Sequence, residues 1–173
     1  MNSRERMLAA INRKPVDRIP TDIWATGEVW AKLRAHFGES ADIGQELHID
    51  GFAGVGPEYI GPALPSVAAD ESVNFWGIRT RRIPHEGGAY MDMTELKKEF
   101  GGRVCFHGAV ENQRILPFGT PEEVRAEVRH CIDALASDGT GYILAPCHNL
   151  QVNTSVENII AMYDEAWTYG KRS

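Results

Sequence analysis

Three side chains that could do chemistry stand directly after short apolar runs of the sequence. His107 follows residues 104–106, and the pair Cys147-His148 follows residues 141–145 and a proline. An imidazole can carry a positive charge near neutral pH and pair with a carboxylate, and a cysteine thiolate is a nucleophile and a soft metal ligand. If the apolar runs are strands, these residues mark where binding or reactive groups leave a sheet.

Each of these residues also has a plainer interpretation. The imidazole of His148 could bind a ligand carboxylate or could donate to loop carbonyls, and His107 could line the same pocket. Cys147 could be a reactive thiol at a strand end, but a free cysteine is commonly a small core residue. Trp24 follows an apolar segment and is the aromatic residue expected nearest to a pocket, although most aromatic side chains belong to the core. No residue is assigned as catalytic.

The last third of the chain alternates helical and strand-like segments with short connections. A helix is predicted over residues 93–100, capped by Asp92 and ended by a left-handed Gly101. Strands are predicted over residues 104–106, ending at His107-Gly108, and over residues 141–145. This alternation is typical of a parallel α/β sheet or barrel, in which loops at the carboxyl ends of the strands carry the chemistry.

Two capping boxes predict where the remaining helices of this region begin. Thr120 and Glu123 form one box, with Pro121 at the first helical position, and Thr154 and Glu157 form the other. Apolar residues at helical spacing follow each box. Cys131 lies on the first of these apolar stripes and is therefore assigned to the core.

The first ninety residues are less regular. Helices are predicted over residues 3–12 and around residues 29–37, with a strand over residues 19–24 between them. Residues 51–65 are rich in glycine and proline and read as loops, and residues 75–83 suggest a β-ribbon.

Composition sets wide limits on fold and function. The chain has 173 residues, of which 43% are hydrophobic, and we expect a single domain over residues 1–173. The net charge of −6 argues against binding to nucleic acid or anionic lipid. No apolar run is long enough to span a membrane, and 3 widely spaced cysteines fit a reduced compartment, so we expect a cytoplasmic protein.

Several phrases, taken in order, resemble the uroporphyrinogen decarboxylase family, and in particular its branch of corrinoid-linked methyltransferases. The opening SRERMLAAINRKPVDRIPTDIWAT is similar to that branch's first helix and strand, and GPEYIGP, WGIRTRRI and GGAYMD are similar to its next loop and ribbon. The stronger likeness is TELKKEFGGRVCFHGAVENQRILPFGTPEEVRAEVRHCIDAL together with GYILAPCHNLQVNTSVENIIAMYDEA. These resemble the family's last strands and helices.

The resemblance implies a fold, an α/β (β/α)₈ barrel of the TIM type, of which this chain would keep only part. Members of the family are usually much longer, and the missing segment would fall between Tyr90 and Thr94. We therefore expect a partial barrel that retains the first and last βα units, with an N-terminal part, residues 1–91, joined to a C-terminal part, residues 92–173. Because a partial barrel leaves open sheet edges, we also expect a homo-oligomer.

The resemblance also implies a zinc site, which this sequence only partly provides. In the methyltransferase branch zinc holds a thiol as thiolate, and the thiolate takes a methyl group from a corrinoid. The family's ligands are a His-x-Cys pair and a cysteine near the last strand. Cys147 corresponds approximately to that cysteine, and nothing here corresponds to the pair.

The decarboxylases of the family imply a different use of the same strand ends. They place a histidine near the position of His148 against a carboxylate arm of the tetrapyrrole. They also hold the acidic substrate with an arginine-rich N-terminal motif, where this chain has IWATGEVWAK.

The family resemblance therefore leads to three expectations for function. The first is a shortened family protein whose parent transferred methyl groups from a methylcorrinoid, carried by a corrinoid protein, to a thiol or similar acceptor. The second is uroporphyrinogen decarboxylation, and the third is a non-catalytic, self-associating barrel fragment.

Overall fold

The computed structural model describes residues 1–52, 60–65, 68, 71–73, 79–81 and 92–171. The chain divides into two compact units, Met1–Phe52 with Met91–Ser173, and Ala53–Tyr90. Each unit is described by itself, and the single domain expected from the sequence stays a prediction. Within the described residues, no helix has the length and apolarity needed to cross a membrane.

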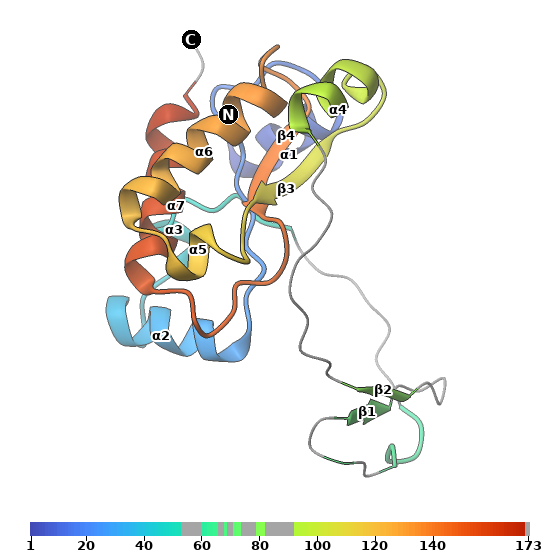
Figure 1. The fold of residues 1–173 in the computed structure, drawn as a ribbon, viewed down its shortest axis with the longest axis vertical. Helices are drawn as coiled ribbons and strands as arrows, with labels where there is room; N and C mark the ends of the chain where they lie inside the picture. The colour runs from blue at the N-terminus through green and yellow to red at the C-terminus, as the bar shows by residue number, and fades with distance from the viewer. Residues whose placement is uncertain (53–59, 66–67, 69–70, 74–78, 82–91, 172–173) are drawn as a thin grey trace. The chain divides into compact units, whose positions relative to one another are not determined.

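The sheet of the first unit is parallel. Strand β3 (Phe106–Val110) pairs with β4 (Tyr142–Pro146), so that Phe106 lies opposite Tyr142. The segment of residues 18–25 lies along the other edge of β4 (Figure 1), where Thr21 and Ala25 form parallel bridges to Leu144 and Leu150. The backbone N–H and carbonyl of Leu144 bond to Pro20 and Asp22, each at 2.9 Å. The predicted first strand thus runs parallel to the last.

The two predicted C-terminal strands exist, but one of them begins later than the sequence suggested. β4 is displaced by a single residue from the predicted 141–145. β3 begins at Phe106, where the predicted strand ended, so the expected strand end at His107-Gly108 is wrong. Gly108 and Ala109 have positive φ angles of 101° and 83° and little intrinsic preference for strands. Pairing with β4 determines this strand, and His107 is its second residue.

The C-terminal helices follow the predicted caps closely. Helix α4 (Met93–Phe100) is capped by Asp92, and α6 (Pro121–Leu135) begins with the Thr120 capping box. Helix α7 (Val156–Tyr169) is capped by Ser155, which accepts from the N–H of Asn158, so the predicted Thr154 box is wrong by one residue. Gly101 is also not left-handed, since its φ is −56°. The short α5 (Ile115–Phe118) was not predicted.

The hydrophobic core of this unit lies between the strands and two long helices. α6 and α7 pack against each other, and α6 also contacts β3 and β4 (Figure 1). Their inward stripes are completely buried and comprise Val124, Val128, Cys131, Ile132, Ile159 and Met162. The prediction that Cys131 is a core residue is confirmed.

The N-terminal helices are also near their predicted places. Helix α1 (Ser3–Ile11) begins with a capping box formed by Asn2 and Glu5. Helix α2 (Gly27–Phe37) ends at Gly38, whose φ of 104° suits glycine. The short α3 (Ile43–Glu46) follows and was not predicted.

The second unit contains a two-stranded antiparallel ribbon. β1 (Glu71–Val73) pairs with β2 (Arg79–Arg81), with Glu71 opposite Arg81. The predicted ribbon over residues 75–83 overlaps β2, and its other residues lie outside the described ranges. The chain is therefore a mixed α/β protein with a small parallel sheet, and its derivation from a (β/α)₈ barrel stays a prediction.

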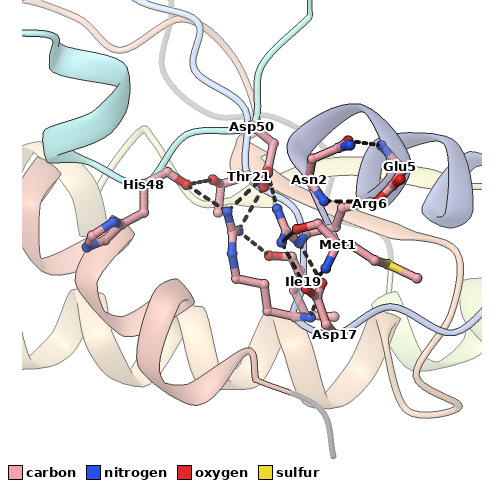
Figure 2. Close-up of polar contacts among 10 residues, drawn as sticks. Met1, Asn2, Glu5, Arg6, Asp17, Ile19, Thr21, His48 and Asp50 are labelled. Carbon is pink, nitrogen blue, oxygen red and sulfur yellow. Dashed lines mark hydrogen bonds and ion pairs between the residues drawn. The ribbon is translucent and has the colours of Figure 1, made fainter.

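A buried ionic network fixes the start of the chain against the first strand segment (Figure 2). The side chain of Asp50 has no exposed surface and pairs with Arg6 at 2.5 Å and with Arg18 at 2.7 Å. It also accepts from the N–H of Thr21 at 3.1 Å. Asp17 bonds Arg6 from the more exposed side at 2.6 Å, and this guanidinium bond holds the pKa of Asp17 well below its ordinary value.

Replacing Asp50 tests whether this network holds the N-terminal segment. Asp50→Ala would leave two largely buried arginines with less negative charge to compensate them, and removal of one partner of a buried ion pair typically costs about 3–5 kcal/mol. We expect a loss of that order in the free energy of unfolding, measured by urea denaturation. Glu99→Ala, at an exposed position of α4, is the control and should change it by less than about 0.5 kcal/mol. Equal stability of the two variants would contradict the assigned role.

Candidate functional site

The parallel order of the strands brings one side chain from each end of the chain to the same face of the sheet. Ala109 of β3 lies opposite Ala145 of β4, and the Thr21–Leu144 bridge places Asp22 next to Ala145 on the other edge. Side chains alternate between the faces of a sheet, so His107 and Asp22 share a face across β4. The small side chains of the two alanines leave room for them to meet.

His107 and Asp22 form a close pair. Nε2 of His107 lies 2.9 Å from Oδ2 of Asp22, and the two residues are separated by 85 positions in the sequence. The Asp22 side chain is 5% exposed and that of His107 is 27% exposed. The backbone carbonyl of Asp22 accepts from the hydroxyl of the buried Tyr163 at 2.9 Å. A buried carboxylate therefore holds a partly exposed imidazole.

Two aromatic rings flank this imidazole. The ring centroid of Trp24 lies 5.4 Å from that of His107, and the centroid of Phe52 lies 5.8 Å from it. Trp24 is 50% exposed and Phe52 is 52% exposed, which is high for large apolar side chains. The structure thus gathers Trp24 and His107, both predicted from the sequence, with Asp22 and Phe52, which were not.

Cys147 and His148 follow β4, as predicted, but within the described part of the chain no hydrogen bond, ion pair or ring contact joins them to His107. The thiol of Cys147 lies 2.9 Å from the side-chain oxygen of Asn112, in the loop after β3. Cys147 lies at the surface, and partial burial by neighbouring atoms raises the pKa of its thiol. His148 is exposed, and within the described residues its side chain forms no hydrogen bond or ion pair.

These surroundings do not fit the zinc site that the family resemblance implies. A zinc ligand is a thiolate, whereas partial burial raises the pKa of Cys147 and so favours its neutral thiol. Within the described part of the chain, no three His, Cys, Asp or Glu side chains gather where they could hold a metal ion. No chemical step through zinc is therefore derived, and Cys147 as a metal ligand stays a prediction.

One of the two missed residues had a weak signal in the sequence. Asp22 is an acidic residue inside an apolar strand segment, where burial requires a partner. Phe52 stands at the edge of a glycine-rich stretch and showed no periodicity. Phe52 reaches His107 only because of the way the backbone runs after α3, which the sequence does not indicate.

Comparison with known protein families bears on the C-terminal half of this site. Residues 85–169 match the family model described as uroporphyrinogen decarboxylase (URO-D). The match supports the URO-D family. It covers the elements from α4 to α7, which carry His107, Cys147 and His148. Asp22 and Trp24 lie outside it. No curated protein matches the chain.

The pair can do two kinds of chemistry. A protonated imidazole beside Asp22 can bind an anionic group, and a neutral one can exchange a proton with a ligand. The aromatic rings supply a flat apolar surface next to either function.

Alkylation of Cys147 tests its assigned environment. Because the pKa of the Cys147 thiol is raised, less thiolate is present at pH 7.5 than for an ordinary cysteine. We therefore expect iodoacetamide to react with Cys147 in the folded protein at roughly one third of its rate in the unfolded chain, or less. The rate should rise with pH beyond the midpoint of a free thiol. Peptide mapping by mass spectrometry separates Cys147 from the other cysteines, and the urea-unfolded chain is the control. Equal rates in folded and unfolded protein would show that the thiol is unperturbed.

Proposed function

We propose that this chain is a shortened URO-D-family protein that binds a planar tetrapyrrole or corrinoid beside His107. The observation that carries the proposal is the pair of half-exposed rings, Trp24 and Phe52, on an imidazole already held by Asp22. Binding sites typically combine apolar and aromatic surface with a few oriented polar groups. A macrocycle with carboxylate or amide arms has both complementary features.

The methyl-transfer lineage is favoured over decarboxylation by the state of the N-terminal arginines. A decarboxylase of this family must neutralise many substrate carboxylates, for which guanidinium groups are best suited. Arg6 and Arg18 are largely buried and are already paired with Asp17 and Asp50. They are not arranged to meet an acidic substrate. We therefore propose a corrinoid as the ligand and a methyl group, accepted by a thiol, as the transferred group.

Binding titrations test the ligand class directly. Hydroxocobalamin and uroporphyrin are each titrated into the protein and binding is followed by equilibrium dialysis. We expect saturable cobalamin binding, weakened by Trp24→Ala and by Phe52→Ala about tenfold each, since loss of a stacked ring costs on the order of 1.4 kcal/mol. Thiol-dependent demethylation of methylcobalamin then tests the reaction.

Phe118→Ala is the matched control, because Phe118 is 72% exposed on α5 and belongs to a different surface. Its affinity for cobalamin should equal that of the unchanged protein. Preferential uroporphyrin binding would favour the decarboxylase alternative. If neither compound binds, or if Phe118→Ala weakens binding as much as Trp24→Ala does, the proposal is wrong.

A second candidate function is self-association through the open edge of β3. In the part of the chain that the structure describes, β3 pairs with β4 along one edge, and no strand is paired with the other. An uncovered edge is a template for pairing with another chain. This observation favours the homo-oligomer expected for a partial barrel.

Sedimentation velocity tests this candidate. We expect dimers or larger species at micromolar concentration. Dilution should shift the distribution toward monomer, because edge pairing between chains depends on protein concentration. A stable monomer at all concentrations would exclude self-association.

A further inference from the structure

We infer that Asp22 is a positioning residue that makes His107 a general base, with Nδ1 as the accepting atom and a small thiol as the proton donor. The inference deepens the proposed function by assigning how the acceptor thiol is activated. It does not require a corrinoid to be bound, so the two can fail separately.

The contact with Asp22 selects one tautomer of the imidazole. A carboxylate can only accept hydrogen bonds, so the atom of His107 that faces it, Nε2, must carry a proton. In the neutral ring the other nitrogen, Nδ1, then has a free lone pair. Nδ1 is separated from Nε2 by Cε1, so its lone pair points in a different direction from the Nε2–H bond that faces Asp22. Within the described residues it takes part in no hydrogen bond.

The position of Asp22 is itself fixed by the fold. Its backbone N–H donates to Leu144 at 2.9 Å, and its carbonyl accepts from Tyr163 at 2.9 Å. The backbone of Asp22 is therefore held from β4 and from α7, which fixes the point from which its carboxylate extends. A base oriented in this way loses little freedom when it takes a proton, which is the use of a positioned third group in catalytic pairs.

The same carboxylate stabilises the product of proton transfer. When Nδ1 takes a proton, His107 becomes an imidazolium whose charge is paired with Asp22 at 2.9 Å. Within the described residues, Asp22 is the charged group that contacts the imidazole of His107. The imidazole also lies beside the uncharged rings of Trp24 and Phe52. The step breaks the S–H bond of the thiol, forms an N–H bond on His107 and leaves a thiolate.

Two observations favour a thiol over a hydroxyl as the donor. The ordinary pKa of a thiol, about 8.5, lies within about two units of that of imidazole, whereas an alcohol is a far weaker acid. Sulfur also makes favourable contacts with aromatic rings, and both Trp24 and Phe52 adjoin the imidazole. The site thus suits a small thiol without any metal to lower its pKa.

Nitrogen-15 NMR of the labelled chain tests the inference in two stages. Near pH 8, two-bond correlation spectra should show His107 as the neutral tautomer protonated at Nε2. Addition of 2-mercaptoethanol should shift the Nδ1 resonance of His107, because Nδ1 accepts a hydrogen bond from the thiol, and ethylene glycol at the same concentration should shift it less. A tautomer protonated at Nδ1, or no response to the thiol, would overturn the inference.

Variants then separate positioning from structure. Asp22→Ala should lower the Nε2-protonated fraction of His107 to that of free histidine and weaken the response to thiol, whereas Asp133→Ala, at an exposed position of α6, should change neither. If Asp22→Ala does not fold, the measurements on the unchanged chain still decide the matter. An unchanged tautomer fraction and an unchanged thiol response in a folded Asp22→Ala protein would show that Asp22 does not position the ring.

Discussion

The arrangement of α1 and the first strand segment depends on the contacts of the Asp50 carboxylate. This carboxylate joins Arg6 on α1 to Arg18 and to the backbone of Thr21, so one buried charge connects a helix and the first strand segment. Burying so many charged groups costs desolvation energy, which the close contacts must offset. The network also affects the position of Asp22, because Thr21 immediately precedes it in the chain. The network that holds Thr21 also fixes where the site begins.

The second constraint is the parallel pairing of residues 18–25 with β4. In a closed barrel the first and last strands are neighbours, and inward side chains from alternate strands share a layer. Asp22 and His107 stand on the two strands that flank β4, as such a layer requires. The pairing of residues 18–25 with β4 therefore brings the two ends of the chain into contact at one small sheet. A local site needs only this contact.

Local features were predictable from the sequence and distant ones were not. The start of α6 follows from the Thr120 capping box, because the residues that make it are neighbours in sequence. The limits of β3 depend on pairing with β4 and were misplaced. His107 and Trp24 were recognised as candidates from their positions beside apolar runs. Asp22 was missed because its partner lies 85 residues away, and nothing in a single sequence connects them.

The residues of the candidate site come from both inside and outside the segment that matches the family model. The matched residues, 85–169, provide His107 and the helices that support it, but the carboxylate and the indole come from the unmatched N-terminal segment. Neither part alone contains the pair. An isolated imidazole on β3 would have no fixed tautomer and no counter-charge, so its chemistry would be that of free histidine. The chemistry proposed for His107 therefore depends on the pairing of residues 18–25 with β4 as well as on the matched segment.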